Sequence, residues 1–232
     1  MAEIVKKGTK SMGRYHYVFP KWSNMLLPAA LAGGAIVPLY VVLVVAYGFS
    51  PETTDVGYQP HQPVPFSHKL HAGELGMDCR YCHNTVERAN HAAIPPTQTC
   101  MNCHTQIHKD SIKIRPLLES YLEGTPVTWR RVHDLPDFVY FSHRAHVIRG
   151  VSCVECHGRI DRMEIVTQVK RLSMGWCLEC HRAPDIHLRD PRLVTKLGWG
   201  NDMSDEDKLA QGTIWRETND LNPSQDCSTC HR

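Results

Sequence analysis

The sequence predicts a domain of short α-helices and loops with little or no β structure, preceded by a single N-terminal membrane helix. Three observations lead to this prediction. A run without charged residues extends over residues 22–51 of the 232-residue chain. Five copies of one short cysteine motif follow this run, and they use all 10 cysteines. The 15 prolines and 15 glycines are typical of a chain rich in loops.

The cysteine motif is Cys-x-x-Cys-His, the attachment signature of c-type haem. The two thiols add to the vinyl groups of one porphyrin, and the adjacent histidine becomes the proximal ligand of the iron. The attachment cysteines are Cys79, Cys82, Cys100, Cys103, Cys153, Cys156, Cys177, Cys180, Cys227 and Cys230. The proximal histidines are His83, His104, His157, His181 and His231. The predicted fold class is therefore a multihaem cytochrome c, with loops and short helices wrapped on five covalently bound haems c.

Zinc is the alternative to haem at these motifs. Cys-x-x-Cys pairs also build zinc ribbons, and ten cysteines would make two four-cysteine sites with one pair left over. Neither zinc nor a disulfide framework explains a histidine directly after every second cysteine. Only 15 of the 232 residues are histidine, so five such neighbours are improbable by chance and the motifs favour haem.

The apolar run at residues 25–49 predicts a membrane anchor, because 25 helical residues span about 37 Å. A cleaved signal peptide, the competing interpretation, has an apolar core of only about 7 to 15 residues. Glu52 and Asp55 follow the run, whereas five basic residues precede it: Lys6, Lys7, Lys10, Arg14 and Lys21. The positive-inside rule then predicts a single pass through the lipid of a bacterial inner membrane. Residues 1–21 would be cytoplasmic, residues 22–50 would span the membrane, and the remainder would be periplasmic.

An internal repeat organises the part of the chain after a predicted proline-rich linker at residues 51–65. Phe-Ser-His-x-x-His at 66–71 recurs 75 residues later at 141–146, and each copy precedes two attachment motifs. We therefore expect a periplasmic pentahaem domain at 66–232, with duplicated modules at 66–140 and 141–190 and a C-terminal haem segment at 191–232. About 36 residues per haem are too few for a separate hydrophobic core around each cofactor. Two helices without cysteine motifs are expected, at 112–122 and from Ser204 toward Gln211.

The distal iron ligands are expected among the nine histidines that follow the membrane segment and lie outside the motifs. Two histidines three residues apart cannot both reach one axial position, so those of each repeat are expected to serve neighbouring haems. These are His68 with His71 and His143 with His146. His91, nine residues before Cys100, is expected to bind the haem there. The reserve distal ligands are His133, His187, Met163 and Met174; a methionine would give one His/Met haem of raised potential or would pack on a porphyrin face.

The paired histidines resemble those of the tri- and tetrahaem cytochromes of the c7 and c3 type. In such units the first histidine binds the next haem in the sequence and the second binds another haem. The resemblance implies that His68 binds the haem at Cys79 and Cys82, and that His143 binds the haem at Cys153 and Cys156. His71 and His146 would reach other haems.

The chain from the membrane helix to about residue 184 resembles the pentahaem subunit of alternative complex III. The likeness rests on one membrane helix followed by five motifs, on the stretch 129–141 and on Ser-Met-Gly-Trp-Cys at 173–177. It implies a bacterial complex that oxidises menaquinol. An iron–sulfur subunit and polytopic quinol-site subunits would pass electrons to this chain. A monohaem cytochrome c, another periplasmic carrier or an oxidase would receive them.

Irons with two axial side-chain ligands transfer electrons rather than bind substrates. We therefore expect an electron-transfer subunit rather than an enzyme, with no catalytic residues and no nucleic-acid partner. One alternative is a stand-alone quinol dehydrogenase of the NapC/NrfH type, in which the first motif follows the membrane helix closely. Here 29 residues separate Phe49 from Cys79. The other alternative is a multihaem terminal reductase, which would need an open iron site.

Overall fold

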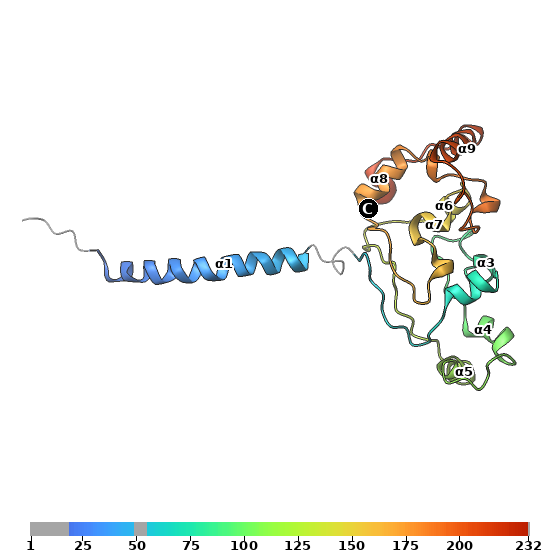
Figure 1. Cartoon of the computed structure of the whole chain (residues 1–232), viewed down its shortest axis with the longest axis horizontal. Coiled ribbons are helices and arrows are strands. Elements are labelled where there is room, and N and C mark those ends of the chain that lie inside the picture. The colour runs from blue at the N-terminus through green and yellow to red at the C-terminus, as the bar shows by residue number, and fades with distance from the viewer. Residues whose placement is uncertain (1–18, 49–54, 232) are drawn as a thin grey trace, which may run out of the picture. The chain divides into compact units, whose positions relative to one another are not determined.

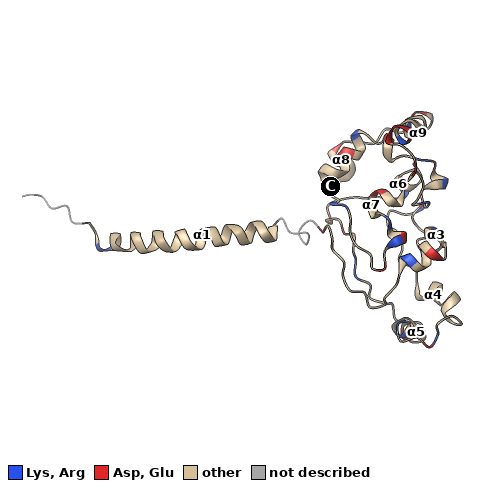
Figure 2. Ribbon diagram, in the orientation of Figure 1, with Lys and Arg blue, Asp and Glu red and all other residues tan. Residues whose placement is uncertain are grey.

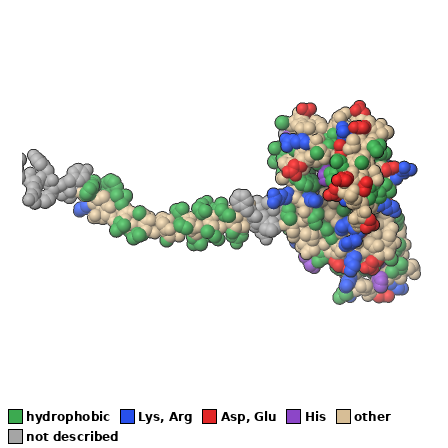
Figure 3. All heavy atoms as spheres, turned by 45° about the horizontal axis from the view of Figure 1, so that its top comes forward, with side chains coloured by type: hydrophobic (Ala, Val, Ile, Leu, Met, Phe, Trp, Pro, Cys, Tyr) green, Lys and Arg blue, Asp and Glu red, His purple; other side chains and the backbone are tan. Residues whose placement is uncertain are grey.

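The structure, a computed structural model, describes residues 19–48 and 55–231. Its contacts divide the chain into two units, Met1–Ser50 and Pro51–Arg232. In the first unit a 3₁₀ turn, η1 (Lys21–Met25), leads into α1 (Leu26–Gly48). Together they form a helix of 28 residues that is long and apolar enough to cross a membrane. Figure 2 shows no charged residue in α1, and the face of this unit in Figure 3 carries many hydrophobic side chains.

The predicted membrane span at 22–50 agrees with this helix up to Gly48. Pro38 lies within α1 and does not end it, and none of the side chains of α1 is buried. A helix that is apolar on all sides is typical of a membrane segment. Residues 49 and 50, residues 1–18 with most of the predicted basic tail, and residues 51–54 of the predicted linker lie outside the described residues. The orientation in the membrane therefore stays a prediction.

The second unit consists of short helices joined by loops (Figure 1). Its α-helices are α3 (Cys79–Cys82), α4 (Thr97–His104), α5 (Arg115–Glu123), α6 (His143–Val147), α7 (Cys153–His157), α8 (Met174–Arg182), α9 (Asp205–Thr218) and α10 (Cys227–Cys230). The unit also contains a π-helix, η2 (Lys69–Glu74), and the 3₁₀ turns η3 (Ile160–Arg162), η4 (Asp185–His187) and η5 (Pro191–Leu193). Within residues 55–231, β structure is limited to isolated bridges of Val139 with His231 and of Val151 with Leu188. The predicted fold class is confirmed.

Buried apolar side chains are few in this unit. Val64, Met101 and Leu117 form a cluster between the predicted linker, α4 and α5. The other buried apolar residues of the described chain are Val147, Leu188, Val194 and Leu197. Seven such residues make a small core for a unit of this length, which supports the expectation that cofactors form much of the interior.

Both expected helices without cysteine motifs are present, with different bounds. α5 begins at Arg115 and ends before Gly124, whose φ of 67° suits a glycine at a helix end. α9 begins after Ser204, which caps it as predicted, but the helix continues past Gln211 to Thr218. Gly212 allows this extension because it has no Cβ atom. A Cβ atom at this position would overlap the backbone oxygen of Asp185. α9 therefore packs closely on η4.

The described part of the predicted linker lies along the domain. The backbone N–H of Gly57 donates to the oxygen of Gln168, and the N–H of Gln168 donates to the oxygen of Tyr58. The Gln62 side chain pairs with the backbone of Arg130, donating to its oxygen at 2.8 Å and accepting from its N–H at 2.9 Å. These bonds join residues 57–62 to two distant segments of the same unit.

Candidate haem-binding sites

Each of the five cysteine motifs lies in a helical turn. Three helices, α3, α7 and α10, begin at the first cysteine of a motif, and the residue before each is an aspartate or a serine. The other two motifs lie in the C-terminal parts of α4 and α8. Residues three apart in a helix lie on the same side of it, so the two thiols of each motif can reach one porphyrin. None of the ten cysteines forms a disulfide with another.

Four of the five proximal histidines face a second histidine ring. The pairs, with the distances between ring centres, are His68–His83 at 6.5 Å, His71–His104 at 6.2 Å, His143–His157 at 6.4 Å and His146–His181 at 6.1 Å. In both repeats, the first histidine faces the first motif that follows it and the second histidine faces the second motif.

These distances fit an iron atom between the rings of each pair. A metal–imidazole bond is about 2.0 Å long and the nitrogen lies about 1.1 Å from the ring centre, so two axial rings should be about 6.2 Å apart. The first pair of each repeat has nearly parallel rings, at 5° and 9°. The second pair has crossed rings, at 61° and 48°. The repeat thus preserves ring orientation as well as ring separation.

The phenylalanine of each repeat orders both of its histidines. Phe66 lies edge-on to His68 at 4.8 Å and stacks on His71 at 4.4 Å. In the second repeat, Phe141 makes the same two contacts at 4.8 Å and 4.6 Å. The sequence revealed this phenylalanine as part of a repeat, but its position between the two rings became evident only in the structure.

Hydrogen bonds to backbone oxygens fix most of these rings at Nδ1. Among the proximal rings, the bonds are His83 to Ala93 at 2.8 Å, His104 to Ile107 at 2.9 Å, His181 to Ser224 at 2.6 Å and His231 to Phe138 at 3.3 Å. Among the facing rings, they are His71 to Ser67 at 2.8 Å, His143 to Asn90 at 2.9 Å and His146 to Ser142 at 2.8 Å. A carbonyl can only accept, so the proton lies on Nδ1 and Nε2 keeps its lone pair for a metal.

Burial also favours the neutral form that binds a metal. It lowers the pKa of His68 to about 4 and, together with the nearby His133, that of His157 to about 3. Burial is the main cause that lowers the pKa of His143 and His146 as well. These imidazoles are therefore neutral near pH 7 and available as ligands.

The predicted pairings of His68 with the first motif and of His143 with the third agree with the ring contacts. The ring contacts differ from the expectation for His91, because His71 rather than His91 faces His104. The loop that contains His91 is held by other contacts: the Thr85 hydroxyl donates to the oxygen of His91. The oxygen of the preceding Asn90 accepts the N–H of His143. His91 therefore lies beside the second repeat.

The fifth proximal histidine and the reserve ligands have other surroundings. His231 contacts the Phe138 ring at 5.8 Å, and no second histidine ring within residues 55–231 faces it. His133 lies against His157 at 4.3 Å, too close for an iron between them. His187 Nδ1 lies 2.7 Å from a carboxylate oxygen of Glu155.

The two reserve methionines lie apart from each other. The backbone oxygen of Met163 accepts from Lys69, which lies in the first repeat rather than at the fourth motif. Met174 begins α8 and is 65% exposed. Neither position makes a methionine the evident partner of His181, whose ring already faces His146.

Contacts between thiols show which motifs are neighbours in space. Burial and the adjacent Cys100 raise the pKa of Cys82, so the second motif adjoins the first. The Cys79 and Cys153 thiols are hydrogen-bonded, which lowers the pKa of Cys79 and raises that of Cys153. The first motif therefore adjoins the third.

The motifs form a row in space, which continues from the third motif to the fourth and fifth. Burial and the adjacent Cys180 raise the pKa of Cys156 to about 12, so the third motif adjoins the fourth. Burial and Cys230 raise the pKa of Cys177, so the fourth motif adjoins the fifth. The spatial order is second, first, third, fourth and fifth. Figure 1 shows the corresponding succession of α4, α3, α7 and α8, with the C-terminus beside α8.

The junction between the first and third motifs is fixed by the segment after η5. The Ser152 hydroxyl donates to the backbone oxygen of Val194 at 2.6 Å, and these residues are only 1% and 0% exposed. Thr195 donates from its hydroxyl to Asp78 at 2.8 Å. Asp78 and Ser152 directly precede the first cysteines of the two motifs. A segment predicted to belong to the C-terminal part of the chain thus holds the two repeats together.

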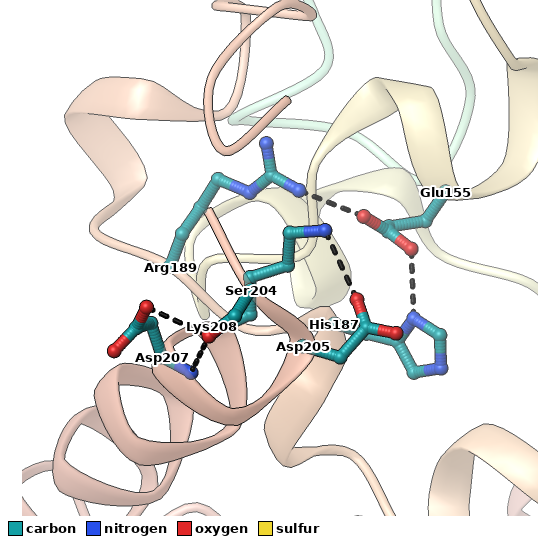
Figure 4. Close-up of polar contacts among 7 residues, drawn as sticks. All are labelled: Glu155, His187, Arg189, Ser204, Asp205, Asp207 and Lys208. Atoms are coloured by element: carbon teal, nitrogen blue, oxygen red, sulfur yellow. Dashed lines mark hydrogen bonds and ion pairs between the residues drawn. The ribbon is translucent and has the colours of Figure 1, made fainter. Parts of the chain in front are cut away.

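A second polar connection joins the third motif to the region after α8. Glu155 accepts hydrogen bonds from His187 and Arg189, both at 2.7 Å, as Figure 4 shows. Arg189 is 7% exposed and packs over the Trp199 ring at 4.6 Å. Its Nε and Nη1 atoms are buried without a hydrogen-bond partner. Two buried donors on a cation fit an anionic group such as a haem propionate.

The zinc alternative finds no support in the arrangement of the thiols. Within the described residues, no group of three or more His, Cys, Asp or Glu side chains could hold one metal ion. A four-cysteine zinc site would need such a group. Two thiols beside one histidine, repeated five times, suit a porphyrin instead.

Comparisons with known proteins agree with these sites. The family described as cytochrome c7 and related cytochrome c matches residues 64–116 and 139–232, which include all five motifs. The chain is 37% identical over 136 residues to the menaquinone reductase multiheme cytochrome c subunit of Nitratidesulfovibrio vulgaris. That alignment covers 56% of this chain and 63% of the relative, so the chain spans less than two thirds of the length of the relative.

Proposed function

The chain belongs to the family of cytochrome c7 and related c-type cytochromes, whose members bind haem c covalently. On that premise, we propose that it is a membrane-anchored pentahaem cytochrome that carries electrons between a quinol-linked membrane complex and a periplasmic partner. Bound haem supplies one-electron exchange between ferric and ferrous iron. The five attachment motifs would hold the five haems, and the facing histidines would supply their distal ligands.

The observation that carries the proposal is the set of four facing histidine pairs at 6.1 to 6.5 Å. Two protein ligands on an iron leave no position for a substrate, and this favours electron transfer over a reductase. For the fifth motif we propose His91 as the distal ligand. Residues 139–143 support this role because they link the fifth motif to the loop that contains His91. Val139 forms a β-bridge with His231, and the N–H of His143 donates to the oxygen of Asn90, the residue before His91.

The row of motifs supports a conductor with two ends. The second and fifth motifs lie at these ends, and they contain the two exposed cysteines, Cys103 and Cys227. The other eight cysteines are half-buried. We propose that electrons enter at one end of the row and leave at the other, because a partner can approach an exposed haem edge most closely there.

The membrane partner is proposed from the anchor and from the relative. The apolar helix Lys21–Gly48 supports attachment to a bilayer, and the charge pattern around it supports a periplasmic haem domain. The relative is by name a subunit of a menaquinone reductase, which supports a quinol-linked complex. The finer proposal is an assembly like alternative complex III. Its iron–sulfur and polytopic quinol-site subunits would donate electrons, and a monohaem cytochrome c, a periplasmic carrier or an oxidase would accept them.

A second candidate function runs electrons in the opposite direction. The name of the relative describes reduction of menaquinone, so periplasmic donors would supply electrons and the membrane subunits would consume them. Both directions use the same row of haems. The NapC/NrfH-type alternative differs from both, because the chain alone would oxidise the quinol.

The test is purification of the complex in mild detergent, followed by haem counting and spectroscopy. We expect five haems per chain, co-purification with iron–sulfur and polytopic subunits, and low-spin ferric signals of two kinds. Nearly parallel axial rings give a rhombic electron paramagnetic resonance (EPR) signal, and crossed rings give a more anisotropic one. A chain that purifies alone and is reduced by menaquinol would support the NapC/NrfH type. A high-spin iron that binds cyanide or nitrite would support a reductase. Comparing the rates with menaquinol and with menaquinone plus a reduced periplasmic carrier decides the direction.

A further inference from the structure

The proximal histidine of the third motif lacks the support that the other four share. His83, His104, His181 and His231 each donate from Nδ1 to a backbone oxygen, at 2.6 to 3.3 Å. No such bond joins His157 to a carbonyl within the described residues. Yet His157 lies at the centre of the row, where its motif adjoins both the first and the fourth. A metal-bound imidazole needs a partner at its other nitrogen to fix its orientation.

His133 lies where that partner should be. Its ring contacts the ring of His157 at 4.3 Å and is turned by 77° to it. The Nε2 atom of His133 is buried without a hydrogen-bond partner. An unpaired buried nitrogen is unfavourable, so this atom is expected to find a partner in the haem-bound protein. The nearest candidate is the ring of His157, whose Nδ1–H has no carbonyl acceptor among the described residues.

The loop that carries His133 is tied to the predicted linker at Arg130 and contains a local ion pair. Gln62 binds the backbone of Arg130 through two hydrogen bonds. The Arg131 side chain forms an ion pair with Asp134 at 2.6 Å. The loop therefore presents the His133 ring to His157 in a defined position. His133 is not needed as an axial ligand there, because the His157 ring already faces His143 at 6.4 Å.

We propose that His133 is a positioning residue for the third haem, which accepts the Nδ1 proton of His157 and so takes the place of the backbone carbonyl. This inference rests on the proposed axial role of His157. An imidazole acceptor makes the bound ring more electron-donating and favours ferric iron. The third haem would then have a lower midpoint potential with His133 than without it.

The test compares three forms of the full chain in its complex: wild type, His133→Phe and His133→Gln. Phenylalanine keeps a ring of similar size but removes both nitrogens, whereas glutamine keeps an acceptor. We expect His133→Phe to raise the midpoint potential of one haem and to change the EPR g-values of one component with nearly parallel rings. We expect His133→Gln to restore part of both. The haem count should stay at five.

The first haem provides an internal control, because its proximal ring is held by Ala93 rather than by a side chain. Its potential and signal should not change in either variant. Unchanged potentials and g-values for every haem would overturn the proposal. So would the loss of one low-spin component with the appearance of a high-spin iron, since His133 would then be an axial ligand. Failure of the proposed function is distinguishable, because wild-type protein would already lack the two low-spin signals.

Discussion

The two repeats hold their histidines alike but surround them differently. Ring separations agree within 0.1 Å between corresponding pairs, at 6.5 and 6.4 Å and at 6.2 and 6.1 Å. The groups behind the rings do not correspond. The Nδ1 atom of His68 is buried without a partner, whereas that of His143 lies 2.9 Å from the oxygen of Asn90. Ala93 supports His83, and the His133 ring lies beside His157.

This comparison suggests how a duplicated module can yield haems with different properties. The positions that set the iron geometry are the repeated ones: phenylalanine, serine and two histidines. The neighbours that tune a bound metal come from loops outside the repeat. The first and third motifs are adjacent in the row, so differences between their neighbours would set the potential step at its centre.

The largest expected effect that tests the comparison is the loss of a distal ligand. His71→Ala and His146→Ala should each convert one of the five haems from low-spin to high-spin, because each removes the ring that faces a proximal histidine. The haems stay attached through the cysteines. The haem count and the ferric EPR spectrum of each variant measure both outcomes.

His91→Ala is the matched control for His71→Ala. If His91 served the second motif, as its sequence position suggested, its removal would abolish the same low-spin component as His71→Ala. The structure favours a different result, in which the two variants affect different components. Identical spectra from the two variants would contradict the pairing of His71 with His104.

The sequence predicted the cofactor motifs, the repeat and the membrane helix, because each depends on residues close together in the chain. The partners of His68 and His143 came from the resemblance to the c7 and c3 cytochromes, and the ring contacts agree with them. The ring contacts favour His71 over His91 at the second motif. Proximity in sequence to Cys100 did not reveal that the oxygen of Asn90 accepts from His143 in the second repeat. The carbonyls behind the rings carry no side-chain signal at all. The contact of Thr195 with Asp78 spans 117 residues and arises only from tertiary packing.

A smaller effect is expected at the junction of the repeats. Ser152→Ala removes the hydroxyl that donates to the buried Val194 carbonyl and leaves that carbonyl only the longer bond from the Cys153 N–H, at 3.3 Å. Loss of one buried hydrogen bond of this kind costs about 0.5–1.5 kcal/mol. Denaturant unfolding, followed through the loss of axial ligands, measures the change in the free energy of unfolding.

Ser173→Ala serves as the control for the junction. Ser173 caps α8 by accepting from the N–H of Trp176, and this bond is solvent-exposed. Removing a cap of this kind costs about 0.5–2 kcal/mol, but it should not change the interaction between the two repeats. The junction variant should therefore alter the potential step between the first and third haems as well as stability. A Ser152→Ala protein with unchanged potentials would mean that the junction supports the fold alone.

The smallest expected effect concerns Asp78, the carboxylate that accepts a hydrogen bond from Thr195 at the same junction. Burial acts to raise the pKa of Asp78, but hydrogen bonds from the Arg80 N–H and the Thr195 hydroxyl, with the charge of Arg80, lower it overall. A carboxyl with a lowered pKa stabilises the fold above its unfolded value of about 3.9, and this contribution disappears as the pH falls through the folded pKa. Asp78→Asn should therefore reduce stability at pH 7 by less than about 1 kcal/mol, since the side chain is partly exposed. The difference from wild type should shrink once the pH falls below the unfolded value and should disappear as the pH falls through the lowered folded pKa. Asp226→Asn, at the same position before the fifth motif, is the matched control, because hydrogen bonds join Asp226 to the nearby Ser224. A constant difference for Asp78→Asn between pH 7 and pH 3 would show that the Thr195 contact acts through shape rather than charge, and that the two repeats are joined by packing around Val194 alone.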